Sequence, residues 1–396
     1  MSRGHTLQDL LQNGHLLVLC GSGGVGKTTT SAALALAAAL AGRKVLVLTI
    51  DPARRLLQAL GLDDRHMPVN TPLDVLPKQA DQLKNWTGTG RLDAMMLDAE
   101  LGAVAMVERL LPDPILRQRV LTNRIYRAFL PTLAASPDYI ALELIANLHE
   151  QGHYDLLVLD TPPMHNAVDF LHAGGTLSSF LNERVLKWFA KVPMPGQKSR
   201  FSFLGSGASV AMSVLGRLFG QETLPDIAEF FSSFQHVLPR LQQRTEATDR
   251  LLRASSTGFV IVTAPGETPR REAAHLHAEL REQSMPFAGF IVNRVLSVPA
   301  GFDCLELTDP KGHSLTQFLQ TAGLSGHVAQ ALLLASQRLE HLAELDADQV
   351  LALRQLAGPL GFATVAAQRD EDLHTLPDLA EFGAALLSAQ QDVVVP

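Results

Sequence analysis

The sequence predicts an α/β protein with a doubly wound, mostly parallel sheet. Short apolar runs with the length and flanks of buried parallel strands alternate with longer segments in which apolar residues recur at three- and four-residue spacing. A glycine-rich turn joins the first strand to the first helix, and aspartates mark the ends of two later strands. Because ligands bind at the carboxyl ends of the strands in such sheets, these positions predict a site at that edge.

The first strand and helix enclose a complete phosphate-binding loop. An apolar run at 16–20 precedes it, and an Ala/Leu-rich helix is expected over about 27–41. The loop has the full G-x-x-x-x-G-K-T pattern, made of Gly21, Ser22, Gly23, Gly24, Val25, Gly26, Lys27 and Thr28. Glycines let backbone N–H groups turn toward a phosphate, Lys27 reaches the β- and γ-phosphates, and Thr28 can bind Mg²⁺. The pattern predicts binding of a nucleoside triphosphate, rather than a turn with a chance lysine.

Two aspartates follow or close later strands. The run 43–50 is followed by Asp51, which is placed to meet the phosphates or an attacking water. An N-cap aspartate before Pro52 at the first helical position is equally good local chemistry, and both roles are compatible. The run 155–160 ends in Asp160, a pattern typical of the carboxylate that holds Mg²⁺ beside a phosphate loop.

The remaining segments complete the sheet and add two helical insertions. Further strands are expected at 91–98, 257–263, 287–294 and 362–367. Further helices are expected at 99–111, 114–133, 137–151, 269–283, about 310–356 and 376–387. We expect one domain over 1–396, with helical insertions at 99–151 and 177–253. The uncharged segment 201–216 is either a buried core helix or a mobile apolar surface for a hydrophobic partner.

Composition excludes several classes of function. The 396 residues carry a formal net charge of −7, which argues against a general nucleic-acid-binding protein. No window reaches the roughly 18 uninterrupted apolar residues of a membrane span, and the first apolar run is too short for a signal peptide. We therefore expect a cytoplasmic protein without stable membrane insertion. Cys20 and Cys304 form neither a disulfide framework nor a C-x-x-C pair.

Taken together, these motifs resemble the ArsA/Get family of dimeric ATPases, in the MinD-like branch of phosphate-loop proteins. The resemblance covers nearly the whole chain: the loop at 23–29, a first switch at 49–53, a second at 160–163, and the adenine region at 292–293. The two insertions fall where the family carries its client-facing subdomain. The resemblance implies an ATP/ADP- and Mg²⁺-dependent ATPase that acts as a dimeric switch on a hydrophobic or membrane-protein client.

Matching positions carry the family's site residues onto this sequence. Gly23 to Gly26 form the cradle, and phosphate and Mg²⁺ contacts fall to Lys27, Thr28 and Thr29. Asp51 matches the aspartate that positions or deprotonates water. Asp160 matches the Mg²⁺ carboxylate, binding directly or through water, and Asn293 matches the residue that reads adenine.

One departure concerns the loop itself. Ser22 stands where the family usually has a lysine that reaches the partner's nucleotide. A serine cannot supply that cation, so the transition-state charge must be neutralised by another group, or turnover should be slow. Arg54 and Arg55 are candidate catalytic substitutes, with a solvated or phosphate-steering pair as the alternative. Pairing with a paralogous subunit that keeps the lysine is a third possibility, so homodimer and heterodimer both stay open.

Two other functions stay open beside the ATPase switch. Loss of the lysine is compatible with an ATP-binding scaffold that hydrolyses ATP negligibly. The family also includes motor subunits of anion efflux pumps. That function requires a metalloid site, and two lone cysteines in unrelated contexts make a three-thiol site within one chain implausible.

Overall fold

The structure is a computed structural model. The structure describes residues 6–50, 55–62, 69–76, 88–124, 137–161, 239–297 and 325–389, together with the single residues 83, 126, 317, 321 and 323. Asp51, Arg54 and the apolar segment 201–216 lie outside the described residues. So do the second switch after Thr161 and most of the second insertion.

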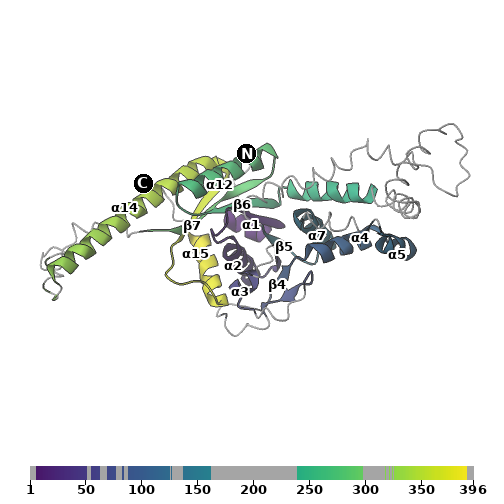
Figure 1. Cartoon of the computed structure of the whole chain (residues 1–396), viewed down its shortest axis with the longest axis horizontal. Coiled ribbons are helices and arrows are strands. Elements are labelled where there is room, and N and C mark those ends of the chain that lie inside the picture. The colour runs from purple at the N-terminus through teal and green to yellow at the C-terminus, as the bar shows by residue number, and fades with distance from the viewer. Residues whose placement is uncertain are drawn as a thin grey trace, which may run out of the picture.

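The core of the fold is an eight-stranded sheet in the order β3-β4-β2-β5-β1-β6-β7-β8 (Figure 1). The parallel strands are β1 (Leu16–Cys20), β2 (Lys44–Thr49), β4 (Arg91–Met96), β5 (Leu156–Asp160), β6 (Thr257–Thr263), β7 (Phe287–Val295) and β8 (Phe362–Ala367). The central strand β1 is buried along its whole length, as its uninterrupted apolar sequence predicts. The edge strand β3 (Leu73–Asp74) pairs antiparallel with β4 and is too short to be recognised from sequence.

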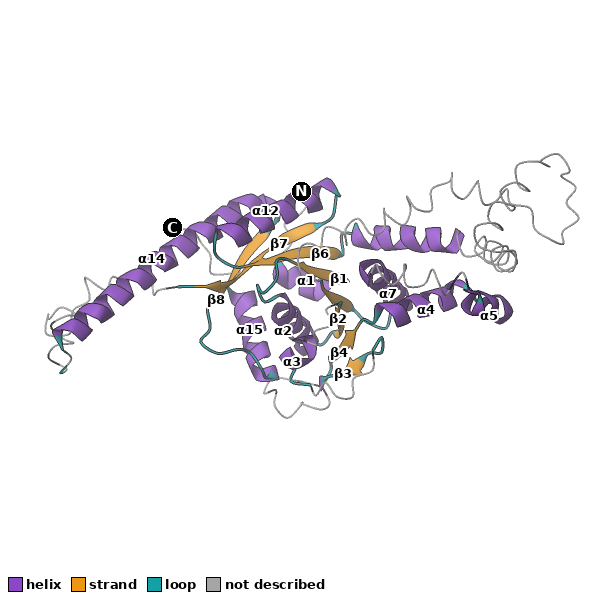
Figure 2. Ribbon diagram, viewed as in Figure 1, coloured by secondary structure: helices purple, strands orange, loops and turns teal. Residues whose placement is uncertain are grey.

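Helices cover both faces of the sheet, and each face has its own apolar core (Figure 2). One core receives side chains from α1 (Leu7–Asn13), α2 (Lys27–Leu40), α3 (Arg55–Ala59) and α15 (Leu376–Ser388). The other receives them from α4 (Ala99–Leu110), α7 (Pro137–Gln151), α12 (Glu267–Glu282) and α14 (Gly326–Ala357). The prediction of a doubly wound, mostly parallel α/β fold is therefore confirmed.

The second helix of the first insertion is shorter than the sequence predicts. The helix expected to run to Leu133 is α5 (Pro114–Thr122), which ends because Asn123 leaves the helical conformation, with φ −64° and ψ 131°. The Asn123 side chain instead accepts a hydrogen bond from the Tyr126 backbone N–H at 3.2 Å. An asparagine that caps the following turn thus interrupts an otherwise helical pattern.

A buried carboxylate joins the first insertion to the helical residues 239–252. Glu143 on α7 is 2% exposed and accepts hydrogen bonds from Arg109 on α4 and from Arg244, the latter at 3.1 Å. A buried carboxylate is retained only when it is paired in this way. The division into one domain with insertions at 99–151 and 177–253 stays a prediction. Within the described part of the chain, none of the helices has the length and apolar character that a membrane crossing requires.

Helix α15 packs closely against α2, the helix that follows the phosphate loop. A Cβ atom at Gly383 would lie 2.8 Å from the Ala33 carbonyl oxygen and 3.3 Å from the Ala37 Cβ atom. We expect Gly383→Val to lower the free energy of unfolding by about 1–3 kcal/mol, because the added methyl groups force the two helices apart. Urea denaturation measures the change.

The matched control adds the same side chain on the exposed side of the same helix, at Ala384. Ala384→Val should lower the free energy of unfolding by less than about 1 kcal/mol, which is its cost in helix propensity. Equal destabilisation by the two variants would contradict the close approach of α15 and α2.

Candidate functional site

The phosphate loop lies between β1 and α2 at the carboxyl edge of the sheet, beside the end of β7. Gly26 adopts a left-handed conformation with φ 92°, which a glycine tolerates without strain. A Cβ atom at this position would collide with the side-chain amide of Asn293. That amide donates a hydrogen bond to the Val25 carbonyl oxygen at 2.9 Å. The last glycine of the motif therefore allows the loop to lie directly against β7.

Lys27 is turned into the loop that precedes it. Its side chain is 7% exposed, and Nζ donates hydrogen bonds to the carbonyl oxygens of Gly21 at 2.9 Å and Ser22 at 2.7 Å. The ammonium group thus sits inside the glycine-rich turn. Beside it lies a cavity of about 200 Å³ lined by Gly23, Gly24, Gly26, Lys27, Thr28, Thr29, Arg55, Thr161 and Arg294.

Asp160 brings together hydroxyl groups from two other elements. The carboxylate is 1% exposed and accepts hydrogen bonds from Thr28 Oγ1 at 2.7 Å and Thr49 Oγ1 at 3.0 Å. Ser31 Oγ donates to its other oxygen at 3.4 Å. Carboxylate and hydroxyl oxygens are the donor atoms that Mg²⁺ prefers, so Thr28 and Asp160 together fit that ion.

Thr49 and Ser31 were not singled out from sequence, although both had a local signal. Thr49 is the last residue of the strand that precedes Asp51, and Ser31 lies one helical turn after Lys27. Both residues reach Asp160 because β5 pairs with β1 and with β2. This pairing places Asp160 close to Thr49 at the end of β2 and to Ser31 in the helix that follows β1.

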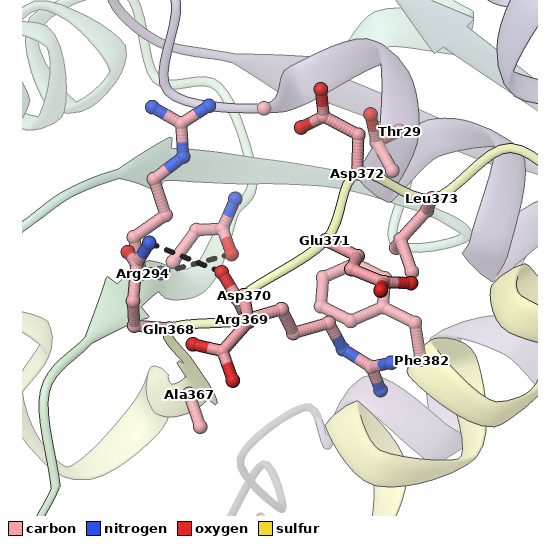
Figure 3. A pocket seen from close by; sticks show the side chains of 12 residues that line it. Thr29, Arg294, Ala367, Gln368, Arg369, Asp370, Glu371, Asp372, Leu373 and Phe382 are labelled. Atoms are coloured by element: carbon pink, nitrogen blue, oxygen red, sulfur yellow. Dashed lines mark hydrogen bonds between the residues drawn. The ribbon is translucent and has the colours of Figure 1, made fainter.

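A second cavity of about 440 Å³ adjoins the phosphate loop (Figure 3). Asn293 lines it, but its amide nitrogen binds the loop and its oxygen accepts the Arg294 backbone N–H at 3.0 Å. The predicted reading of adenine by Asn293 stays a prediction. The opposite wall carries Phe382, with the Arg369 guanidinium 5.6 Å from its ring centre.

The segment after β8 supplies the rest of this wall, and no sequence motif marks it. Three acidic side chains line the cavity there: Asp370, Glu371 and Asp372. Their carboxylates can accept hydrogen bonds from groups such as sugar hydroxyls, while Arg294 and Arg369 bring positive charge to the same cavity.

The structure describes some of the candidate catalytic residues and not others. Arg55 lines the smaller cavity, whereas Asp51 and Arg54 lie outside the described residues. The Ser22 hydroxyl donates a hydrogen bond to the Glu272 carboxylate on α12. The structure brings Lys27, Thr28 and Asp160 together at the phosphate loop, and their binding roles stay predictions, as do the catalytic roles of Asp51, Arg54 and Arg55.

Comparison with known proteins identifies the family. A sequence model of the anion-transporting ATPase (ArsA) family matches residues 15–315. The chain belongs to this family. The matched region runs from the beginning of the first strand through the phosphate loop, Asp160 and Asn293, so the resemblance to ArsA/Get-type ATPases is confirmed.

Several named ATPases align over most of this chain. ATPase GET3B of Arabidopsis thaliana is 29% identical over 309 residues, which cover 72% of this chain and 65% of that protein. The putative arsenical pump-driving ATPase 2 of Aquifex aeolicus is 26% identical over 281 residues, which cover 70% and 78% of the two chains. ATPase GET3 of Malassezia globosa is 25% identical over 305 residues, which cover 76% of this chain and 78% of that protein. This chain thus spans slightly less than two thirds of the length of ATPase GET3B.

Cys20 lies buried at the end of β1, directly before the phosphate loop. Burial raises the pKa of its thiol to about 12, although a hydrogen bond with Thr161 and the charge of Lys27 act in the opposite direction. We expect Cys20 in a Cys304→Ser variant to resist iodoacetamide at a pH near the ordinary thiol value of 9.0, because the thiolate does not form in the folded protein.

Mass spectrometry after timed alkylation measures this protection. The same variant in denaturant is the control and should take up one adduct rapidly. Equal alkylation rates in folded and unfolded protein would show that the end of β1 is open to solvent.

Proposed function

We propose that this chain binds ATP together with Mg²⁺ and hydrolyses it as a nucleotide-driven switch. The proposal rests on one observation: two cavities meet at the phosphate loop, and different kinds of side chain line them. The smaller cavity is lined by Lys27 and Arg55, and Thr28 in its wall contacts Asp160. The larger one carries Asn293 and an aromatic ring. A phosphate chain fits the first, and a nucleoside fits the second.

Different residues supply different parts of the proposed chemistry. Backbone N–H groups of the loop and the Lys27 ammonium neutralise charge on the β- and γ-phosphates. Thr28 and Asp160 hold Mg²⁺, which, when bound, withdraws charge from the phosphate oxygens. Thr49 fixes the orientation of the Asp160 carboxylate through its hydroxyl group, whereas the Ser31 hydroxyl makes its shorter hydrogen bond, at 2.9 Å, to the Lys27 carbonyl oxygen. Asp51 is proposed to position or deprotonate the attacking water, as the family resemblance implies.

We further propose that the active species is a cytoplasmic dimer, either of two copies or with a paralogue, whose helical insertions bind a hydrophobic or membrane-protein client. Family membership and the names of the GET3 relatives support this. The contact of Glu143 with Arg109 and Arg244 is consistent with it, since this contact joins the first insertion to the helical residues 239–252. Efflux of arsenite is disfavoured, because Cys20 is buried with a raised pKa and Cys304 is the one other cysteine of the sequence.

Removal of the phosphate-loop lysine tests the proposed activity. We expect Lys27→Ala to reduce ATP turnover to the uncatalysed background and to weaken ATP binding, because it removes the ammonium group that sits inside the loop. Phosphate release and calorimetric ATP titration measure the two effects. Lys44→Ala is the control, since Lys44 is exposed at the opposite end of β2.

Three results would distinguish the candidate functions. Turnover that Lys27→Ala leaves unchanged would refute the ATPase mechanism. Tight ATP binding by the wild type, with turnover at background both alone and with hydrophobic peptide, would favour the scaffold. Turnover that rises with arsenite would favour the efflux motor.

The hydroxyl contacts of Asp160 give a separate test of the Mg²⁺ site. Thr49→Val keeps the shape of a buried strand residue and removes one donor to Asp160. We expect it to raise the Mg²⁺ concentration needed for half-maximal turnover about tenfold, as loss of such outer contacts does in other metal sites. Thr364→Val is the matched control, since Thr364 is also buried in a strand but donates to the Leu386 carbonyl oxygen. If both variants raised the required Mg²⁺ concentration equally, the effect would come from changing a buried strand residue and not from losing the contact with Asp160.

A further inference from the structure

The end of β7 has an irregularity that changes where Arg294 points. The pairing of β7 with β8 shifts register between Val292 and Val295, and Arg294 lies in the left-handed region with φ 62°. In a regular strand, neighbouring residues point to opposite faces of the sheet. Here Asn293 and Arg294 both line the larger cavity. Bulges beside binding sites commonly re-aim a side chain in this way.

Arg294 lies at the junction of the two cavities. It lines both, as do Gly26 and Thr29 of the phosphate loop and its helix. Figure 3 shows its side chain extending from the end of β7, whereas Arg369 lies against Phe382 on another wall. The smaller cavity also carries the cations Lys27 and Arg55, and the three acidic residues line the larger one. Arg294 therefore marks the boundary between the cationic and the acidic half of the site.

Within the part of the chain that the structure describes, the Arg294 guanidinium has no hydrogen-bond or ion-pair partner. The residue nevertheless occupies a backbone region that non-glycine side chains rarely adopt. Such conformations persist where the surrounding structure holds them, and they are concentrated at binding and catalytic sites. An unpaired cation on a backbone of this kind, facing a phosphate-sized cavity, fits an anionic ligand.

We propose that Arg294 binds the α-phosphate of the nucleotide. The inference rests on the proposed binding of ATP at this site. A nucleotide with its β- and γ-phosphates beside Lys27 and its nucleoside in the larger cavity places the α-phosphate at the junction that Arg294 lines. The planar guanidinium fork matches two phosphate oxygens at once.

The test is Arg294→Gly in the full chain, titrated with ATP and with ADP by calorimetry. Glycine adopts φ 62° without strain, so the variant should fold and melt at or above the wild-type temperature. We expect both nucleotides to bind about tenfold or more weakly, and by the same factor, because both carry an α-phosphate. Arg294→Lys should recover part of the affinity, since it restores the charge without the fork.

Ser284→Gly is the matched control for backbone strain. Ser284 also has a positive φ of 55°, and it lies before β7, at the opposite end of that strand from Arg294. This variant should bind both nucleotides as the wild type does. Unchanged affinity in Arg294→Gly would overturn the proposal, and a loss confined to ATP would overturn the assignment to the α-phosphate. Absence of nucleotide binding by the wild type would instead refute the proposed function itself.

Discussion

The buried carboxylate of Asp160 is the constraint on which the site depends. A charge that is 1% exposed at the end of an apolar strand is tolerated only when donors surround it. The strand order supplies them, because β5 lies between β1 and β2. Thr49 reaches Asp160 from β2, and Thr28 reaches it from the helix that follows β1. The same contacts that satisfy the buried charge therefore hold the phosphate loop in register with the neighbouring strands.

A second connection runs from the loop to β7 on the other side of β1. Asn293 donates to the Val25 carbonyl oxygen, and the absence of a side chain at Gly26 gives this amide its space. The loop is thus fixed from both sides, by Asp160 through Thr28 and by Asn293 through Val25. A loop held in this way loses little further freedom when a ligand binds, which lowers the entropic cost of binding an anion.

Patterns local in sequence predicted the fold and the centre of the site. The apolar runs gave the main strands, and the G-x-x-x-x-G-K-T pattern and the aspartate closing 155–160 marked Lys27, Thr28 and Asp160. The missed features depend on contacts between distant segments. Thr49 matters because β2 pairs with β5, and Arg294 matters because a register shift re-aims it. The acidic wall after β8 has no local signature, and the early end of α5 depends on one capping asparagine.

The position of Ser22 changes how charge is balanced around the loop. Its hydroxyl is bound to Glu272 on α12, so the side chain is directed toward an element of its own chain. This contact places a carboxylate beside the loop. That carboxylate opposes the binding of phosphate groups. If the proposed nucleotide binds, the cations that line the smaller cavity have to offset its charge as well as that of Glu272: Lys27, Arg55 and Arg294. Under the proposed function, Arg294 adds a third cation to this cavity from a segment distant in sequence, and it does so from a backbone conformation that non-glycine residues rarely adopt.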